Sequence, residues 1–266
     1  MSKEDDILLG AIEDKIDKCA DDYMMTNSVF LDMRQRTIAE GMCKKRKGLV
    51  YVLYGGYEEA ERTIALFLPD YIDIDRTDFD GIHKYFMENS AYNPLALLRI
   101  CNESARGKEL SHRDYLGAIT GLGIKREMVG DILVRKDGAD IIILKELAEF
   151  LIVHYEKAGR AYLSGEIKLI EELIVPEGRF EEVKDTVASL RIDNVVASAF
   201  KTSRSKAAEA VTGGVVFVNG IQIDKTDKQV KEGDKIVLRG KGKVLLQQVG
   251  GITRKDRMFI VLKRYL

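Results

Sequence analysis

The chain has 266 residues, 45% hydrophobic and 32% charged, with a net charge of −1, and no apolar run in it approaches the length that crosses a membrane. This composition excludes a membrane-spanning chain and leaves room for two or three domains. The near-zero charge hides an asymmetry, because residues 181–266 hold 17 Lys+Arg against 10 Asp+Glu, whereas the first 180 residues hold 25 against 33. The basic C-terminal third is therefore the region expected to contact a polyanion directly.

The cysteines and the N-terminal residues indicate the cellular compartment of the chain. Cys19, Cys43 and Cys101 are odd in number and far apart, so they indicate neither a disulfide framework nor a zinc site. The N-terminus is polar and acidic, unlike a signal peptide, and the three histidines are too scattered to suggest a metal site. We expect a cytoplasmic monomer without metal, cofactor or membrane partner.

Residues 1–88 are predicted to form an N-terminal α+β domain. Apolar residues fall at helical spacing from Ile7 to Ile16, and a second helix is expected to begin after Asp32, a good N-cap residue. The apolar runs 50–54 and 63–68 are each bounded by turn residues and are predicted strands.

Residues 89–174 are predicted to form a ferredoxin-like domain. The order strand-helix-strand-strand-helix-strand is that of the ferredoxin-like unit, which RNA recognition motifs also use. Isoleucines at 141–143 occupy a strand where stacking rings would be needed, so base stacking on this sheet is not expected. The second helix is expected to bury Phe150. The predicted elements are residues 95–101, 112–121, 131–135, 139–144, 145–157 and 161–169.

A linker is predicted over residues 171–187, and residues 181–266 are predicted to form the third domain. Pro176-Glu177-Gly178 interrupts an acidic run in the linker, which is typical of a domain boundary. The basic domain is expected to contain two short helices, a hairpin turn at Asn219-Gly220 and further strands. The predicted helices are 191–200 and 204–212, and the predicted strands are 215–218, 221–223, 235–239 and 259–262.

Basic residues gather at the start of the second of these helices. Lys201, Arg204 and Lys206 stand among Ser203 and Ser205, beside the amides that a helix N-terminus leaves unbonded. This convergence suits a phosphate whatever the base sequence. An isolated Ser-Arg-Ser-Lys is more often a solvated helix start, but the hairpin that follows and the charge asymmetry favour the phosphate site.

Two further basic clusters follow along the chain. Arg239, Lys241 and Lys243 alternate with glycines that let the backbone approach a ligand, although the spacing of a P-loop is absent. Arg254 and Lys255 precede the last predicted strand. Both clusters are candidate RNA contacts.

No catalytic residue is expected. Asp193 lies two residues after Arg191, near the start of the first predicted helix of the basic domain. It is expected to orient that arginine or a backbone amide rather than to transfer protons. His112-Arg113-Asp114 echoes a kinase catalytic loop, but the required Asn is missing, so it predicts a helix start.

A glycine-rich loop lies between the first helix and second strand of the central domain. It either brings Lys125 and Arg126 to a ligand or is a simple surface turn, and the sequence leaves both open. With His112 and Arg113 these residues are a possible second RNA contact.

The segment from Arg191 to Arg239 resembles an S-four domain, a small RNA-binding module, through Arg-x-Asp, Ser-Arg-Ser-x-Ala and Val-Asn-Gly. The whole chain resembles the bacterial YlmH family. The motifs that carry this resemblance are Phe30-Leu-Asp-x-Arg34, Tyr54-Gly-Gly-Tyr57, Glu59-Ala-Glu-Arg62, His112-Arg-Asp-Tyr-Leu-Gly-Ala118, Gly121-Leu-Gly-Ile-Lys-Arg-Glu127, Gly130-Asp-Ile132 and Gly240-Lys-Gly-Lys243.

The resemblance implies an α+β chain with an N-terminal domain, a recognition-motif-like central domain and a C-terminal S-four domain. It implies a non-enzymatic RNA binder that associates with the large ribosomal subunit, ribosomal RNA and tRNA during rescue or quality control of stalled translation complexes. The expected RNA-binding residues are Arg191, Lys201, Ser203, Arg204, Ser205, Lys206, Asn219, Arg239, Lys241, Lys243, Arg254 and Lys255.

Two alternatives remain open. S-four domains also accompany RNA-modifying enzymes such as pseudouridine synthases, but neither Asp114 nor Asp193 stands in the Arg-Leu-Asp context of those enzymes. A cell-division scaffold is suggested only by the family resemblance.

Overall fold

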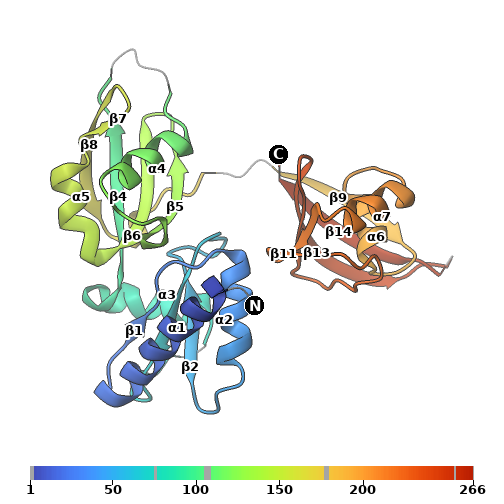
Figure 1. Ribbon diagram of the computed structural model, residues 1–266, viewed down its shortest axis with the longest axis horizontal. Coiled ribbons are helices and arrows are strands. Elements are labelled where there is room, and N and C mark those ends of the chain that lie inside the picture. Colours follow the sequence, from blue (N-terminus) through green and yellow to red (C-terminus); the bar gives the residue numbers. More distant parts are fainter. Residues whose placement is uncertain (1–2, 75–76, 105–108, 177–179, 255, 266) are drawn as a thin grey trace. The chain divides into compact units, whose positions relative to one another are not determined.

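The chain forms two compact units, Met1–Pro176 and Glu177–Leu266, and each is described by itself (Figure 1). The structure is a computed structural model, and it describes all residues except 1–2, 75–76, 105–108, 177–179, 255 and 266. No helix among the described residues combines the length and the apolar character needed to cross a membrane. The domain divisions predicted at residues 88/89 and 174/181 remain predictions.

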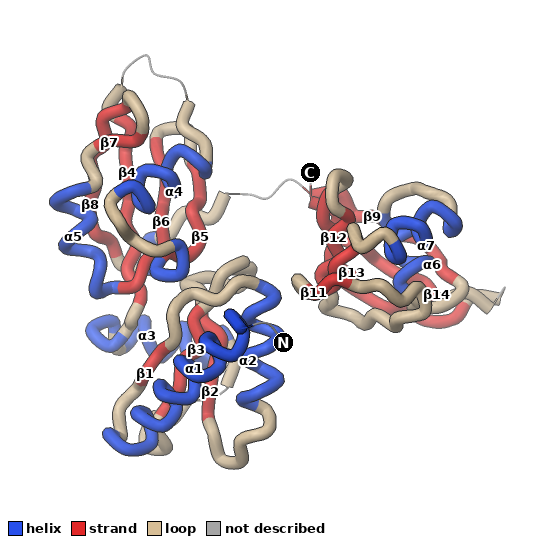
Figure 2. The backbone as a smooth tube through the Cα atoms, in the orientation of Figure 1, coloured by secondary structure: helices blue, strands red, loops and turns tan. Residues whose placement is uncertain are grey.

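The first half of the first unit is a three-stranded antiparallel sheet with helices on both faces (Figure 2). The central strand is buried along its whole length. A capping box between Asp32 and Gln35 starts the second helix, as the sequence predicted, whereas the third helix was not predicted. The elements are α1 (Lys3–Asp22), β1 (Thr26–Asn27), α2 (Met33–Cys43), β2 (Val50–Tyr54), β3 (Ile64–Leu68) and α3 (Phe79–Glu88), and the strand order is β1-β3-β2.

The second half of this unit confirms the predicted ferredoxin-like arrangement. Its sheet has the strand order β5-β6-β4-β8-β7, in which the four main strands follow the ferredoxin-like order. The elements are η1 (Ser90–Tyr92), β4 (Leu95–Asn102), α4 (His112–Gly121), η2 (Arg126–Met128), β5 (Val129–Val134), β6 (Gly138–Leu144), η3 (Lys145–Leu147), α5 (Ala148–His154), β7 (Lys157–Ala158), β8 (Ala161–Lys168) and η4 (Ile170–Glu172).

Both faces of this five-stranded sheet are covered by protein. Helices α4 and α5 pack on one face, and the other packs against the first half of the unit, where Leu97 and Ile142 are fully buried beside Phe30 and Tyr54. RNA recognition motifs stack bases on that second face. The first half of the unit therefore takes the place that bases would occupy, which explains why no stacking rings are needed there.

One prediction for helix α5 was wrong. The helix was expected to begin at residue 145 and to bury Phe150, but residues 145–147 form the separate turn η3, and Phe150 is 41% exposed. The helix also ends earlier than predicted, at His154. The rest of the apolar stripe does face the core, because Ala148, Leu151 and Tyr155 are buried.

The second unit is a six-stranded antiparallel sheet of order β11-β10-β12-β13-β14-β9 with helices α6 and α7 on one face (Figure 2). The two-residue turn at Asn219-Gly220 is confirmed, with both residues at positive φ, as a hairpin of matching twist requires. The elements are β9 (Phe180–Val187), α6 (Ile192–Ala199), α7 (Arg204–Thr212), β10 (Val216–Val218), β11 (Ile221–Gln222), β12 (Lys235–Leu238), β13 (Gly242–Ile252) and β14 (Met258–Tyr265).

Two strands of this unit differ from the sequence prediction. The linker predicted over 171–187 is too long, because Phe180–Val187 is strand β9 and pairs with β14 along its length. Strand β13 was not predicted, and it is the longest strand of the sheet, spanning Gly242–Ile252. Strand β9 alternates exposed with half-buried residues over 180–184, and β13 alternates half-buried with buried residues over 243–246. This period-two pattern in a charged stretch is the signal that the prediction missed.

Candidate nucleic-acid interface

The side chain of Asp193 lies at the centre of the helix pair α6 and α7. It is 3% exposed, and its two oxygens each accept a hydrogen bond of 3.1 Å from the Arg191 guanidinium. The Nε atom of Arg204 donates to the same carboxylate at 3.0 Å, and the backbone N–H of Asn194 donates at 2.9 Å. The predicted orienting contact to Arg191 is therefore present, and a second arginine from the next helix shares it.

This arrangement fixes two arginines from different helices on one ionised carboxylate. Burial alone would raise the pKa of Asp193, but the hydrogen bonds from Arg191 and Arg204 outweigh it, and the pKa lies below its ordinary value. Arg204 keeps 57% of its side chain exposed and Arg191 33%. Both guanidinium groups thus retain solvent-facing N–H groups in fixed positions, which suits phosphate binding.

The start of α7 supplies the neighbouring polar groups. Ser203 caps the helix, its Oγ accepting from the backbone N–H of Lys206 at 3.3 Å. The side chains of Ser205 and Lys206 are exposed. Lys201 precedes them at φ +48°, and its Nζ atom lies 3.6 Å from a carboxylate oxygen of Glu181. Serine hydroxyls, lysines and helix amides are thus gathered at one junction.

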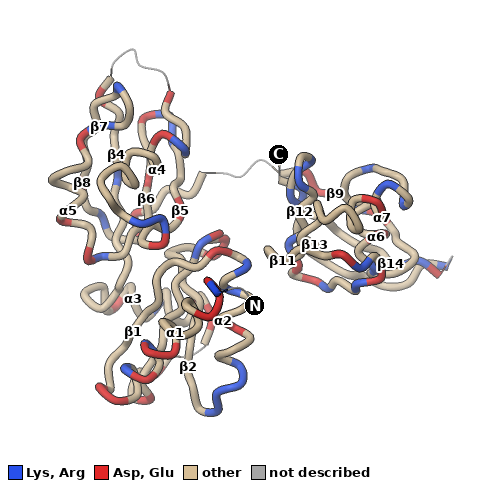
Figure 3. Tube along the Cα trace, in the orientation of Figure 1, with Lys and Arg blue, Asp and Glu red and all other residues tan. Residues whose placement is uncertain are grey.

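The other two basic clusters lie at opposite ends of strand β13. Arg239, Lys241 and Lys243 surround the turn between β12 and β13, where Leu238 pairs with Gly242 (Figure 3). Arg254 lies in the turn to β14, beyond the pairing of Ile252 with Met258, and is exposed. The candidate Lys255 lies outside the described residues. The structure therefore does not bring all the predicted contacts into one site.

Asn219 has its polar groups bound within the protein. Its side-chain amide donates to Asp234 at 2.8 Å, and its Oδ1 atom accepts the backbone N–H of Lys235 at 2.9 Å. Its own N–H donates to the carbonyl of Lys235 at 2.9 Å. These bonds hold the hairpin against strand β12, and this is the role that the geometry gives Asn219.

The four residues of the possible second contact lie on α4 and the loop after it. His112, Arg113 and Lys125 are exposed, and Lys125 lies 3.8 Å from Glu127. Arg126 instead turns inward, its Nη1 atom donating to the backbone carbonyls of Val129 and Gly130. Burial, and then the neighbouring Arg62, lower the pKa of Arg126 to about 10, and burial with Arg126 lowers the pKa of His112.

A buried carboxylate near this loop was not assigned any role from the sequence. Asp131 accepts hydrogen bonds from the Tyr57 hydroxyl at 2.8 Å and from the backbone N–H groups of Glu61 and Arg62 at 2.7 and 3.1 Å. The Arg62 guanidinium donates in turn to the carbonyls of Phe30 and Val129. Four motifs quoted from the sequence meet here, so co-occurrence of the motifs was the available signal.

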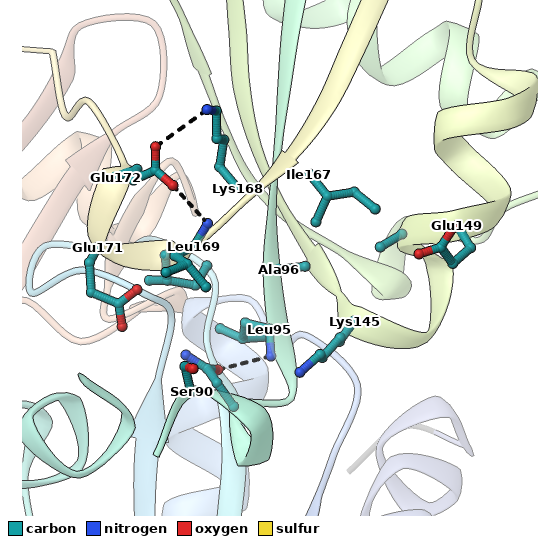
Figure 4. A pocket seen from close by; sticks show the side chains of 13 residues that line it. Ser90, Leu95, Ala96, Lys145, Glu149, Ile167, Lys168, Leu169, Glu171 and Glu172 are labelled. Carbon is teal, nitrogen blue, oxygen red and sulfur yellow. Dashed lines mark hydrogen bonds and ion pairs between the residues drawn. The ribbon is translucent and has the colours of Figure 1, made fainter. Parts of the chain in front are cut away.

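A cavity of the first unit, about 510 Å³ in volume, lies between η1, β8 and η4 (Figure 4). Its charged lining is already paired in part: Lys168 contacts Glu172 at 3.5 Å and Glu166 at 3.3 Å, and the Asn93 side chain accepts from the N–H of Leu95. Among the described residues there is no group of His, Cys, Asp and Glu arranged to hold a metal ion. The candidate interface is therefore the helix pair of the second unit.

The chain is similar to known proteins in two of its domains and over most of its length. Residues 93–172 match the model of the YlmH RNA-binding domain, and residues 190–236 match that of the S4, or S-four, domain. A solved structure, the cell division protein ylmH from Streptococcus pneumoniae, aligns at 27% identity with a TM-score of 0.49, covering 65% of this chain and 96% of that one. The ribosome-associated protein quality control protein P2 of Bacillus subtilis (strain 168) is 32% identical over 243 residues, 91% of this chain and 88% of that protein. With two domains matched and a relative aligned over nearly its whole length, the chain belongs to the YlmH family.

Proposed function

We propose that this chain is a non-enzymatic RNA-binding factor that associates with the large ribosomal subunit and with tRNA in the rescue or quality control of stalled translation complexes. It acts as a cytoplasmic monomer without a cofactor. The observation that carries the proposal is the pair of arginines held on Asp193 beside the capped start of α7. The B. subtilis relative, named as a ribosome-associated quality control protein, supports the ribosome as the partner.

The mechanism is phosphate capture on a preformed surface. Arg191 and Arg204 are fixed before RNA arrives, so little side-chain entropy is lost when a phosphate binds them. Lys201, Ser205 and Lys206 contribute further donors at the same junction. None of these groups reads a base edge, so the site binds a backbone of particular shape.

The chemistry of the carboxylates favours binding over catalysis. A catalytic acid or base needs a pKa near the working pH, but the pKa of Asp193 is lowered and its oxygens are bound to two arginines. The second candidate, Asp114, accepts from the backbone N–H and hydroxyl of Ser111 in a helix cap. Neither is placed to attack a base, so the pseudouridine synthase alternative has no support at these residues.

We also propose a second, weaker RNA contact through His112, Arg113 and Lys125 on the first unit. Their exposure at the start of α4 and the following loop supports it. Arg126 is given a positioning role there, since its guanidinium holds the loop to the start of β5.

Sucrose-gradient sedimentation with ribosomal subunits over a salt series tests the main proposal. The wild-type chain is expected to migrate with the large subunit at low salt, and R204E/K206E is expected to remain at the top of the gradient. The variant H112A/R113A/K125A should reduce the salt at which the chain dissociates. Unchanged migration of R204E/K206E would contradict the mechanism. A modified base found by mass mapping of ribosomal RNA after incubation with the chain would restore the enzyme alternative.

A further inference from the structure

The face of the six-stranded sheet that is turned away from α6 and α7 carries aromatic rings and cations. Antiparallel partners point to the same side of a sheet, so the register assigns its residues. Val216, Ile236, Val244 and Leu262 form the core face, and their neighbours along each strand face outward. Part of this outward set is a group of aromatic rings and the cations against them, which we call the outer stripe. It consists of Phe180, Phe217, Arg239, Lys243, Lys263 and Tyr265.

Each ring of the outer stripe lies against a cation. The Arg239 guanidinium carbon is 4.9 Å from the ring centre of Phe217, and Lys243 Nζ is 4.5 Å from that of Tyr265. Lys263 Nζ lies 4.4 Å from the centre of Phe180 and 5.8 Å from that of Tyr265. All four distances are within the range of cation–π contacts. Rings and cations are therefore interleaved across four strands and one turn.

The charge of this face is one-sided. The charged residues that the register places on the described strands of this face are Lys184, Lys235, Lys243 and Lys263 against Glu182 alone. Glu182 is itself paired with Lys184 at 2.8 Å. Arg239, at the end of β12, adds another cation on the same side. A face with this excess of positive charge attracts a polyanion.

The aromatic groups distinguish between polyanions. Phe180 is 52% exposed, so one large ring faces solvent at the sheet edge. Bases of a duplex are stacked on one another and cannot reach such a ring, whereas unpaired bases can. We propose that the outer stripe binds single-stranded RNA, with bases stacked on Phe180 and Tyr265 and the adjoining phosphates near Lys243, Lys263 and Arg239.

The outer stripe adjoins the helix junction at the edge strand β9. Lys201 of the junction lies 3.6 Å from Glu181, and the next residue toward the start of that strand is Phe180 of the outer stripe. Successive residues of a strand point to opposite faces. An RNA strand leaving Lys201 thus reaches the outer stripe by passing round β9. The outer stripe goes beyond the proposed function, since it binds unpaired RNA whether or not that RNA belongs to the ribosome.

Fluorescence anisotropy of the full chain with a labelled 12-nucleotide oligouridine, chosen because it forms no duplex, tests this proposal. Loss of one stacking ring is expected to weaken binding by about tenfold, so F180L and Y265L should each raise the Kd by that factor. The variant F180Y keeps a ring and should retain wild-type affinity. K263Q should weaken binding more than K184Q. Both variants remove one positive charge from the same face, but Lys263 lies against a ring, whereas Lys184 is paired with Glu182.

Three outcomes overturn the proposal: unchanged affinity in both F180L and Y265L, equal losses in F180L and F180Y, or equal losses in K184Q and K263Q. The last two would mean that only general charge or strand integrity matters. Thermal melting of each variant separates loss of folding from loss of binding. R204E/K206E distinguishes the two proposals. If this variant loses ribosome association while binding of oligouridine still depends on Phe180, the two surfaces act separately. The failure of one proposal would then not affect the other.

Discussion

The Nε atom of Arg204 lies 3.0 Å from Oδ2 of Asp193, eleven residues earlier in the chain. This contact crosses from the start of one helix to the start of the next. Because Asp193 also accepts from the Nε and Nη2 atoms of Arg191, a single buried carboxylate determines where two arginine side chains lie. The proposed phosphate site therefore depends on a negative residue that need not touch RNA.

Replacing Asp193 with Asn should weaken RNA binding even though it removes a negative charge from a basic unit. Asn cannot accept from both arginines in the same geometry, so their guanidinium groups lose their fixed positions. We expect a loss of roughly 1–3 kcal/mol in the free energy of unfolding, the usual effect of disrupting buried charge-assisted hydrogen bonds. Urea unfolding and anisotropy with a ribosomal RNA fragment measure the two effects. D224N, which makes the same charge change at an exposed position, should not lower RNA affinity.

The same carboxylate predicts a pH dependence. The pKa of Asp193 is lowered in the folded chain, so the ionised form stabilises the fold at any pH above the ordinary value of an aspartate, about 4. This stabilisation should disappear as the pH falls through the lowered folded-state pKa. The difference in unfolding free energy between wild type and D193N should thus be constant from pH 7 to about 5 and shrink at more acid pH. A difference that grows on acidification would contradict the assignment.

Salt dependence should separate residues that touch phosphate from those that do not. Each phosphate contact contributes a slope of about 0.7–0.9 in log affinity against log salt. K206A should therefore reduce the slope by about that amount. K45A, at an exposed lysine in the turn after α2 of the first unit, should leave it unchanged. Equal slopes in wild type and K206A would remove Lys206 from the site.

Two glycines of the central sheet and helix should respond oppositely to Ala. At Gly138 in β6 a Cβ atom would stand 1.8 Å from the carbonyl oxygen of Ile100 on β4, so G138A must push the strands apart. At Gly117 in α4 a Cβ meets nothing within 4 Å, and Ala should stabilise the helix by about 1 kcal/mol. Thermal melts of the two variants should shift in opposite directions.

Asp131 should hold residues 57–62 to strand β5. D131A leaves the Tyr57 hydroxyl and two backbone amides without their acceptor. We therefore expect the free energy of unfolding to fall by on the order of 3 kcal/mol. Hydrogen exchange at the amides of Glu61 and Arg62 should accelerate. Y57F removes a single bond and should leave both amides protected; acceleration in Y57F as large as in D131A would place the anchor at Tyr57 instead.

Local patterns in the sequence predicted much of the fold. The caps at Asp32 and Ser203 and the turn at Asn219-Gly220 were predicted correctly because each depends on a few adjacent residues. The order of elements in the central sheet was also predicted, since the apolar runs and their breaks are local. Strands β9 and β13 were missed because their exposed faces are charged or contain glycine, which masks the alternation.

The long-range contacts could not be predicted in the same way. Asp131 and Glu61 meet across 70 positions of sequence, and nothing local indicates which carboxylate binds which amide. The covering of Leu97 and Ile142 is a similar case, since an apolar strand does not show what packs on its second face. At the helix pair, by contrast, Arg191, Asp193 and Arg204 lie close in sequence, so part of that contact could be predicted.

The pairing of β9 with β14 affects how the second unit is made during synthesis. Phe180 stands opposite Tyr265, so the first and last strands of the unit are hydrogen-bonded neighbours. While the chain is being translated, β9 emerges well before β14, the strand that it pairs with among the described residues. Contacts of such wide separation form late in folding. A nascent chain that ends before β14 should therefore lack the complete sheet, together with Lys263 and Tyr265 of the outer stripe.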